Sequence, residues 1–190
     1  PFIGAAFITQ TKSLSKQAWL GISVGAITLA ASIVGFLQVR EAGVLFWETA
    51  SLGIFQPALR VDSLSSLFSL FSAFVWFATG IYMYTYMQHE ERVSSFYIFY
   101  LITLGATQGI FLAGNFITLL VFFEIMTVTS FFWVIHRQDQ EAVRAGYFYL
   151  FLGIAAGLFI VRAIVLLQAT GISLEIGVAA GMPTTSTMFA

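Results

Sequence analysis

The sequence contains no cysteine and has few charged residues, prolines and histidines. The absence of Cys from all 190 residues excludes disulfides, thiolate metal sites and cysteine nucleophiles. Charged residues make up 9% of the chain, whereas a soluble domain usually carries about 25%. With a formal net charge of −1, the chain offers no basic surface for a nucleic acid. These absences argue against a soluble enzyme and against a nucleic-acid-binding protein.

Long apolar runs fill most of the chain. It is 59% hydrophobic with 21 Phe residues, and its mean hydropathy is +0.91. The runs are continuous rather than alternating, which favours helices over the strands of a β-barrel. We therefore predict an all-α, polytopic transmembrane helix bundle with a partial first helix and five full spans, at 1–8, 18–39, 63–87, 94–113, 114–136 and 145–168.

The other segments are shorter and more polar. Residues 40–62 predict an extramembrane loop or a short hairpin, and residues 171–190 read as the approach to a further helix. Because the chain starts inside one short apolar segment and stops near another, we expect a piece of a longer subunit, which arises either as a fragment or through a split gene. All 190 residues would belong to a single transmembrane domain.

One carboxylate, Glu124, lies near the middle of the apolar stretch Gly114 to His136. An ionised acid at that depth costs ~2.5–3.5 kcal/mol on insertion scales. Removal from water favours the neutral form of a carboxyl group, so such a residue can hold and release a proton. Glu124 is therefore a candidate proton relay. The alternative is an acid that only holds neighbouring helices together.

Three further polar residues are candidates for supporting roles. Thr127 follows Glu124 by about one turn, and its hydroxyl bonds either to that carboxyl or to its own backbone. Gln108 is either part of an interhelical hydrogen bond or part of a proton wire. His136 is either an interfacial residue or a relay to the cytoplasmic surface. It and His89 lie at predicted membrane edges, so we expect no metal or haem site between them.

Two features suggest which predicted spans are neighbours. The spans 94–113 and 114–136 follow each other through what reads as a very tight turn, which would make them antiparallel neighbours. The last span, 145–168, carries Gly146, Gly153 and Gly157 in line, and small residues allow two membrane helices to approach closely.

Three motifs carry a family resemblance. The helix around Glu124 resembles the fifth-helix signature of the proton-conducting antiporter-like membrane subunits. This family includes the large membrane subunits of respiratory complex I, Mrp-type antiporter subunits and subunits of group 4 membrane-bound hydrogenases. The matching residues, in chain order, are Leu59-Arg60-Val61-Asp62-Ser63-Leu64-Ser65, Gly114-Asn115, Phe123-Glu124-Ile125-Met126, Thr129-Ser130 and Glu141-Ala142-x-x-Ala145-Gly146-x-x-Tyr149.

The resemblance implies a fold of fourteen helices with two inverted repeats, of which this chain supplies the N-terminal part. It also implies that Glu124 pairs with a lysine on a broken seventh helix, which this sequence does not contain. The implied function is translocation of H⁺, or of Na⁺ against H⁺, by one subunit of a redox-driven or antiporter complex. Such a protein carries no redox cofactor or metal of its own, even in an ion-translocating oxidoreductase.

The implied partners are other membrane subunits, the lipid bilayer, H⁺ and Na⁺. The implied location is an inner or cytoplasmic membrane, or the mitochondrial inner or thylakoid membrane. Two alternatives remain open at this point. One is a standalone secondary cation/proton transporter, and the other is a structural membrane protein of the complex without a channel of its own.

Overall fold

The computed structural model describes residues 1–11, 13–48, 56–89 and 92–176. Its elements are α1 (Phe2–Ile8), α2 (Leu14–Ala42), β1 (Leu45–Glu48), β2 (Ala58–Val61), α3 (Ser63–Tyr86), a 3-10 turn η1 (Met87–His89), α4 (Val93–Phe111), α5 (Phe116–Val134) and α6 (Gln140–Ala169). Helices α2 to α6, five in all, are long and apolar enough to cross a membrane. The predicted all-α bundle with five full spans is confirmed, and the chain is an integral, multi-pass membrane protein.

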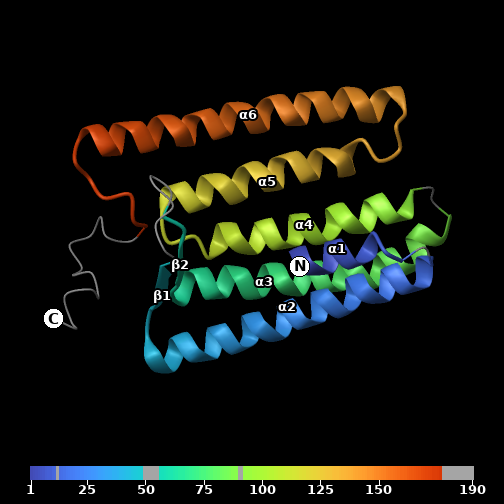
Figure 1. Ribbon diagram of the computed structural model, residues 1–190, viewed down its shortest axis with the longest axis horizontal. Coiled ribbons are helices and arrows are strands. Elements are labelled where there is room, and N and C mark those ends of the chain that lie inside the picture. Colours follow the sequence, from blue (N-terminus) through green and yellow to red (C-terminus); the bar gives the residue numbers. More distant parts are fainter. Residues whose placement is uncertain (12, 49–55, 90–91, 177–190) are drawn as a thin grey trace.

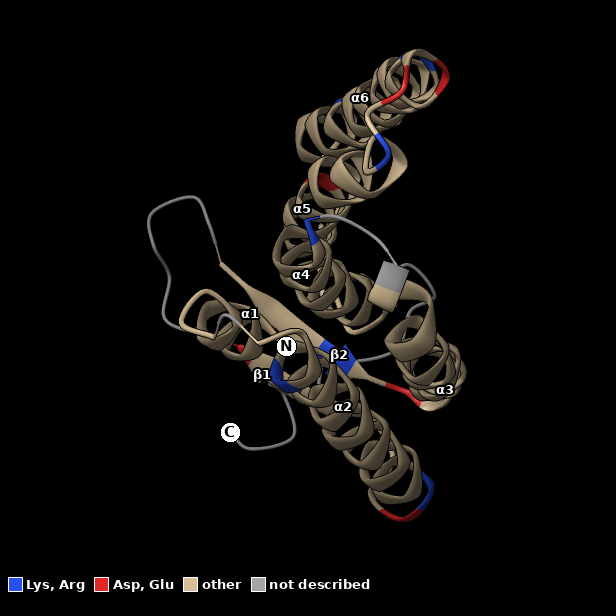
Figure 2. Ribbon diagram, turned by 90° about the vertical axis from the view of Figure 1, so that its right-hand side faces the viewer, with Lys and Arg blue, Asp and Glu red and all other residues tan. Residues whose placement is uncertain are grey.

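The helices lie side by side and α4 occupies the centre of the bundle. Figure 1 shows the long helices running in nearly the same direction, and Figure 2 shows them almost end-on. In that second view α6, α5 and α4 form a row, and α1, α2 and α3 gather beyond α4. The largest fully buried side chains of α4 are those of Tyr97, Tyr100, Leu101 and Leu104.

Aromatic rings join α4 to two of its long neighbours, α3 and α5. The Tyr100 ring lies 5.2 Å from the Trp76 ring of α3 and 5.8 Å from the Trp133 ring of α5, between ring centroids. The Tyr100 hydroxyl also donates to the Trp76 carbonyl oxygen. Such aromatic pairs stabilise the helix contact beyond the burial of their apolar surface.

Polar side chains fix where three of the helices begin. Asp62, Asn115 and Asp139 each accept a hydrogen bond from a backbone N–H group in the first turn of α3, α5 and α6. A helix begins after its N-cap residue, whereas a membrane span is predicted to begin at the first residue of an apolar run. For this reason α6 begins at Gln140, ahead of the predicted span at 145–168, and includes the charged residues that precede that span.

The connection between α2 and α3 contains an antiparallel strand pair. Strand β1 pairs with β2 so that Leu45 lies opposite Val61 and Glu48 opposite Ala58. In the predicted loop or hairpin at 40–62, residues 40–42 thus continue α2, and the described residues after them include a hairpin-like strand pair. Residues 49–55 of that segment lie outside the described residues, as do residues 177–190 of the predicted approach to a further helix.

Four residues, 112–115, connect α4 to α5, and the two helices are neighbours, as the prediction of a tight turn implied. On one side of the connection the Gly114 N–H donates to the Ala58 carbonyl and the Arg60 N–H donates to the Leu112 carbonyl, at 2.8 Å each. On its other side the Ile176 N–H donates to the Gly114 carbonyl at 2.9 Å. Sequence proximity could not reveal these partners, which come from segments far away in the chain.

Arg60 ties this small sheet to the segment that follows α6. Its Nη1 atom donates to the Ile176 carbonyl at 2.6 Å, and its Nε atom lies 3.4 Å from Asp62 Oδ2. Asp62 in turn caps α3. One end of the bundle is therefore joined by hydrogen bonds from β2, from the α4–α5 connection and from residues 174–176.

Helices α4 and α5 approach closely at Gly109. A Cβ atom on residue 109 would overlap the ring of Phe122, whereas a Cβ on Gly35 of α2 would meet nothing within 4 Å. We expect Gly109→Ala to destabilise the protein by ~1–3 kcal/mol, the usual cost of overpacking. Thermal unfolding of the full-length protein in detergent measures this effect, with Gly35→Ala as the control. Equal unfolding temperatures for the two variants would contradict the close packing described here.

Candidate functional site

Glu124 lies close to the middle of α5 and points at α6. Its side chain is partly buried. A Cβ atom on Gly157 of α6 would overlap the Glu124 Oε1 atom and would lie 3.2 Å from its Cδ atom. The carboxyl group therefore lies against the α6 backbone at Gly157, in the space that the side chain of a larger residue would fill. Helix α6 covers it on this side.

The carboxyl group of Glu124 has no cationic partner within the described residues. The ion pairs found there are Arg60 with Asp62 and Arg137 with Asp139. Arg162, the basic residue in the later part of α6, is exposed and does not pair with Glu124. Among the described residues, the carboxyl group is therefore not held in an ion pair.

Thr127 is the nearest candidate to Glu124 on α5. Its side chain is buried, at 2% exposure, and its Cγ2 methyl group occupies the space beside Gly153 of α6. Across the part of the chain that the structure describes, its hydroxyl donates neither to the Glu124 carboxyl nor to its own backbone. Both bonds that the sequence allowed are absent there. The hydroxyl remains one turn from the carboxyl and shielded from bulk solvent.

Gln108 lies in a different interface, between α4 and α3. Its Oε1 atom accepts from the Ser69 hydroxyl at 2.6 Å, and its Nε2 atom donates to the Ser69 carbonyl at 3.3 Å. The Ser69 hydroxyl also lies 3.2 Å from the Ser32 hydroxyl of α2. Gln108 therefore makes the interhelical hydrogen bond that was one of its two predicted uses. A row of three polar side chains crosses α2, α3 and α4.

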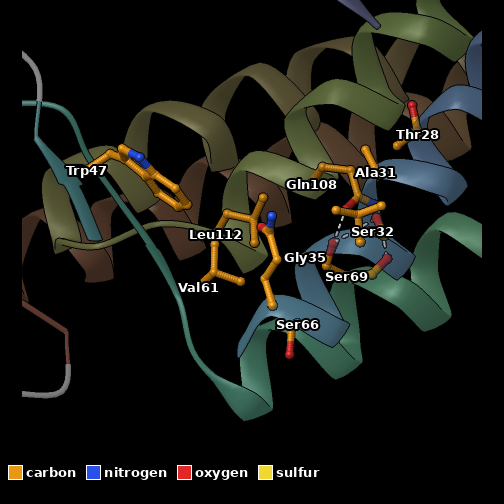
Figure 3. Close-up of a pocket in the computed structure, with 12 residues that line it drawn as sticks. Thr28, Ala31, Ser32, Gly35, Trp47, Val61, Ser66, Ser69, Gln108 and Leu112 are labelled. Carbon is orange, nitrogen blue, oxygen red and sulfur yellow. Dashed lines mark hydrogen bonds between the residues drawn. The ribbon is translucent and has the colours of Figure 1, made fainter. Parts of the chain in front are cut away.

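A cavity of about 470 Å³ opens beside this row. Figure 3 shows the hydroxyls of Ser32 and Ser69 and the amide of Gln108 meeting at its wall. Trp47 of β1 and Val61 of β2 line it nearer the strand pair. The surface of the cavity is mostly apolar. Of its polar wall, only Gln108 was a candidate from the sequence.

His136 follows the end of α5 and is remote from Glu124. Its ring meets the Phe96 ring edge-on, with centroids 5.6 Å apart and an interplanar angle of 71°. Along a helix with a rise of ~1.5 Å per residue, it lies roughly 18 Å from Glu124. The structure therefore brings Thr127 alone of the three supporting candidates close to Glu124.

Thr103 and Thr129 form a polar contact that sequence reasoning missed. The buried Thr103 hydroxyl of α4 donates to the Thr129 hydroxyl of α5 at 2.9 Å. Thr129 donates in turn to the Ile125 carbonyl of its own helix at 2.8 Å. The alternation of Thr and apolar residues after Glu124 was a signal for this contact.

For metal binding, the described residues contain no group of three or more His, Cys, Asp or Glu side chains.

No family model matches the chain, but several curated proteins do. It is 30% identical over 119 residues to hydrogenase-4 component B of Escherichia coli K12, a match that covers 62% of this chain and 18% of that protein. It is 29% identical over 122 residues to an Na⁺/H⁺ antiporter subunit of Staphylococcus haemolyticus, covering 62% of this chain and 15% of the relative. It is also 29% identical over 151 residues to a probable K⁺/H⁺ antiporter subunit of Rhizobium meliloti, covering 77% of this chain and 15% of the relative.

Two solved structures share the fold. A chain of the membrane-bound sulfane sulfur reductase, an archaeal respiratory membrane complex, superposes with a TM-score of 0.77 at 22% identity. That match covers 89% of this chain and 36% of the other. A chain of the Mrp complex from Dietzia sp. DQ12-45-1b superposes with a TM-score of 0.66 at 17% identity, covering 93% and 21%.

The chain spans between 15% and 18% of the length of these three curated relatives. The sequence matches lead to antiporter subunits and a hydrogenase component, and the fold matches lead to chains of an archaeal respiratory membrane complex and of an Mrp complex. The chain is thus related, over part of their length, to the antiporter-like membrane subunits found in Mrp-type antiporters and membrane-bound respiratory complexes.

Proposed function

We propose that this chain forms part of a proton- or cation-translocating subunit in a multi-subunit membrane complex, with Glu124 as its proton-binding group. The observation that carries the proposal is the carboxyl group inside a membrane-spanning helix, sheltered by α6 and without a cation beside it among the described residues. Intramembrane acids of this kind mark ion pathways and proton relays. The named activities of the related antiporter subunits support the same assignment.

The proposed chemistry is a change of charge at one site. A proton that reaches the carboxylate neutralises it and removes the cost of a charge in an apolar interface. Release of that proton restores the charge, and the change is felt by any other charged group nearby because the local dielectric is low. The Thr127 hydroxyl, buried one turn away, is placed to hydrogen-bond a water molecule that serves the carboxyl group.

Gln108 and His136 are assigned more distant roles. The Gln108 amide holds α3 and α4 together at the cavity wall through Ser69, so we assign it to the polar lining of that cavity. His136 lies at the end of α5, where an imidazole can exchange protons with the membrane surface. Neither side chain contacts Glu124 within the described residues.

The partners in this proposal are other membrane subunits. The outward side of α6 exposes large apolar side chains that only lipid or further helices can cover, namely Tyr147, Phe148, Phe151, Leu158 and Phe159. The transported ions would be H⁺ and, in an antiporter, Na⁺. Any electron-carrying group would belong to other subunits, and the complex would reside in an energy-coupling membrane such as a bacterial cytoplasmic membrane.

Replacing Glu124 tests the proposal directly. Glu124→Gln keeps the size and polarity of the side chain but removes its ability to ionise. We expect ion pumping by the assembled complex to fall severalfold, measured as the pH gradient formed across reconstituted vesicles. Unchanged pumping would refute the role of Glu124. Impaired assembly with normal pumping by the surviving complex would instead support the structural alternative.

Thr127→Val tests the supporting role of the hydroxyl. The substitution keeps the branched shape beside Gly153, so thermal stability should not fall. Pumping should drop by about fivefold, the effect of losing one hydrogen bond of ~1 kcal/mol.

The matched control for that experiment is Thr129→Val, which removes a hydroxyl bonded to Thr103. It should lower the unfolding temperature and leave the pumping of the folded protein close to normal. A loss of pumping that is equal in the two variants would show that the Thr127 hydroxyl has no special part.

A further inference from the structure

Three glycines of α6 face α5, and each occupies a place where a side chain would collide. A Cβ atom on Gly146 would overlap the Ile135 Cγ2 methyl, and one on Gly153 would overlap the Thr127 Cγ2 methyl. A Cβ on Gly157 would overlap the Glu124 Oε1 atom. Gly146 and Gly157 are both buried in this interface.

The contact at Gly157 differs from the other two in its chemistry. At Gly146 and Gly153 hydrocarbon packs against the α6 backbone, which is the usual purpose of small residues between membrane helices. At Gly157 the group in contact is the carboxyl group. The Glu124 Oε1 atom lies in the space that the side chain of any residue larger than glycine would fill. The residue at position 157 therefore decides where the carboxyl group can lie.

We propose that Gly157 is a positioning residue for the Glu124 carboxyl group, an inference that rests on the proposed function. With Ala at this position, the carboxyl must turn about its own torsions into another rotamer and leave the α6 backbone. Proton transfer depends steeply on the placement of the groups that exchange the proton, and a displacement near 1 Å can cost on the order of a hundredfold.

A purely structural role for Gly157 makes a different prediction. If glycine served only to bring the helices together, Gly157→Ala and Gly146→Ala would have similar consequences, because both add one methyl group to the same interface. If Gly157 positions the acid, its substitution changes the reactivity of Glu124 itself. Substitution of Gly146, whose Cβ would lie nearest to Ile135 and Phe131, then affects packing alone.

The experiment measures that reactivity without relying on transport. In the full-length protein, within its assembled complex, an apolar carbodiimide labels protonated carboxyl groups in the membrane, and Glu124→Gln identifies the label that belongs to Glu124. We expect Gly157→Ala to slow labelling of Glu124 by about tenfold, with Gly146→Ala and Gly35→Ala close to the unsubstituted protein. Equal labelling rates for Gly157→Ala and Gly146→Ala would overturn the inference.

A shorter acid provides the second arm of the test. Glu124→Asp retracts the carboxyl by about one carbon–carbon bond, ~1.5 Å, and so moves it away from residue 157. Adding Gly157→Ala to Glu124→Asp should then slow labelling by much less than Gly157→Ala does alone. The same tenfold loss in both backgrounds would contradict the proposal.

If the complex with Gly157→Ala does not assemble, a further variant still tests the inference. Glu124→Ala combined with Gly157→Ala removes the colliding group, so it should restore assembly, whereas Glu124→Ala should not rescue Gly146→Ala. Failure to restore assembly would overturn the inference.

The two proposals fail separately. Normal pumping by Glu124→Gln together with altered labelling in Gly157→Ala would reject the relay and keep the positioning role. Severe loss of pumping in Glu124→Gln together with unaltered labelling in Gly157→Ala would keep the relay and reject the positioning role.

Discussion

The contact between the Glu124 carboxyl and the backbone of α6 at Gly157 is the interaction on which the site depends. A carboxyl group in a membrane-spanning helix is too costly to leave against lipid. Helix α6 shelters it, and the glycine leaves enough room for the side chain to fit. The described residues supply no cation to hold the charge permanently. The acid is thus covered by α6 and without an ion-pair partner among the described residues.

The end of the bundle near the strands fixes the depth of that carboxyl group. Asn115 caps α5 while the connection before it is hydrogen-bonded to β2 on one side and to residues 174–176 on the other. Counted from this cap, Glu124 lies roughly 13 Å along the helix. Arg60 joins the same sheet to the chain beyond α6. The two helices that form the site are therefore anchored at one common end, and their glycine contacts set the spacing between them.

The helices and the candidate acid could be predicted because both depend on local properties of the sequence. Continuous apolar runs define spans, and one carboxylate within such a run is conspicuous. Which neighbouring helix each side of α5 meets could not be predicted, because the few polar residues of this helix form no stripe along one face. The line of glycines in α6 was visible, but not that the Glu124 carboxyl occupies the place beside Gly157. The polar row from Ser32 to Gln108 and the hydrogen bonds of the connection at Gly114 depend on partners far away in the chain, which periodicity does not reveal.

The central claim is that Glu124 changes its protonation state while sheltered between α5 and α6. Difference infrared spectroscopy of the energised complex in membranes tests this most directly, because a protonated carboxyl group has its own carbonyl stretching band. The account predicts a band that changes during turnover and disappears in Glu124→Gln. A spectrum in which no carboxyl band changes, or in which the changing band persists in that variant, would contradict it.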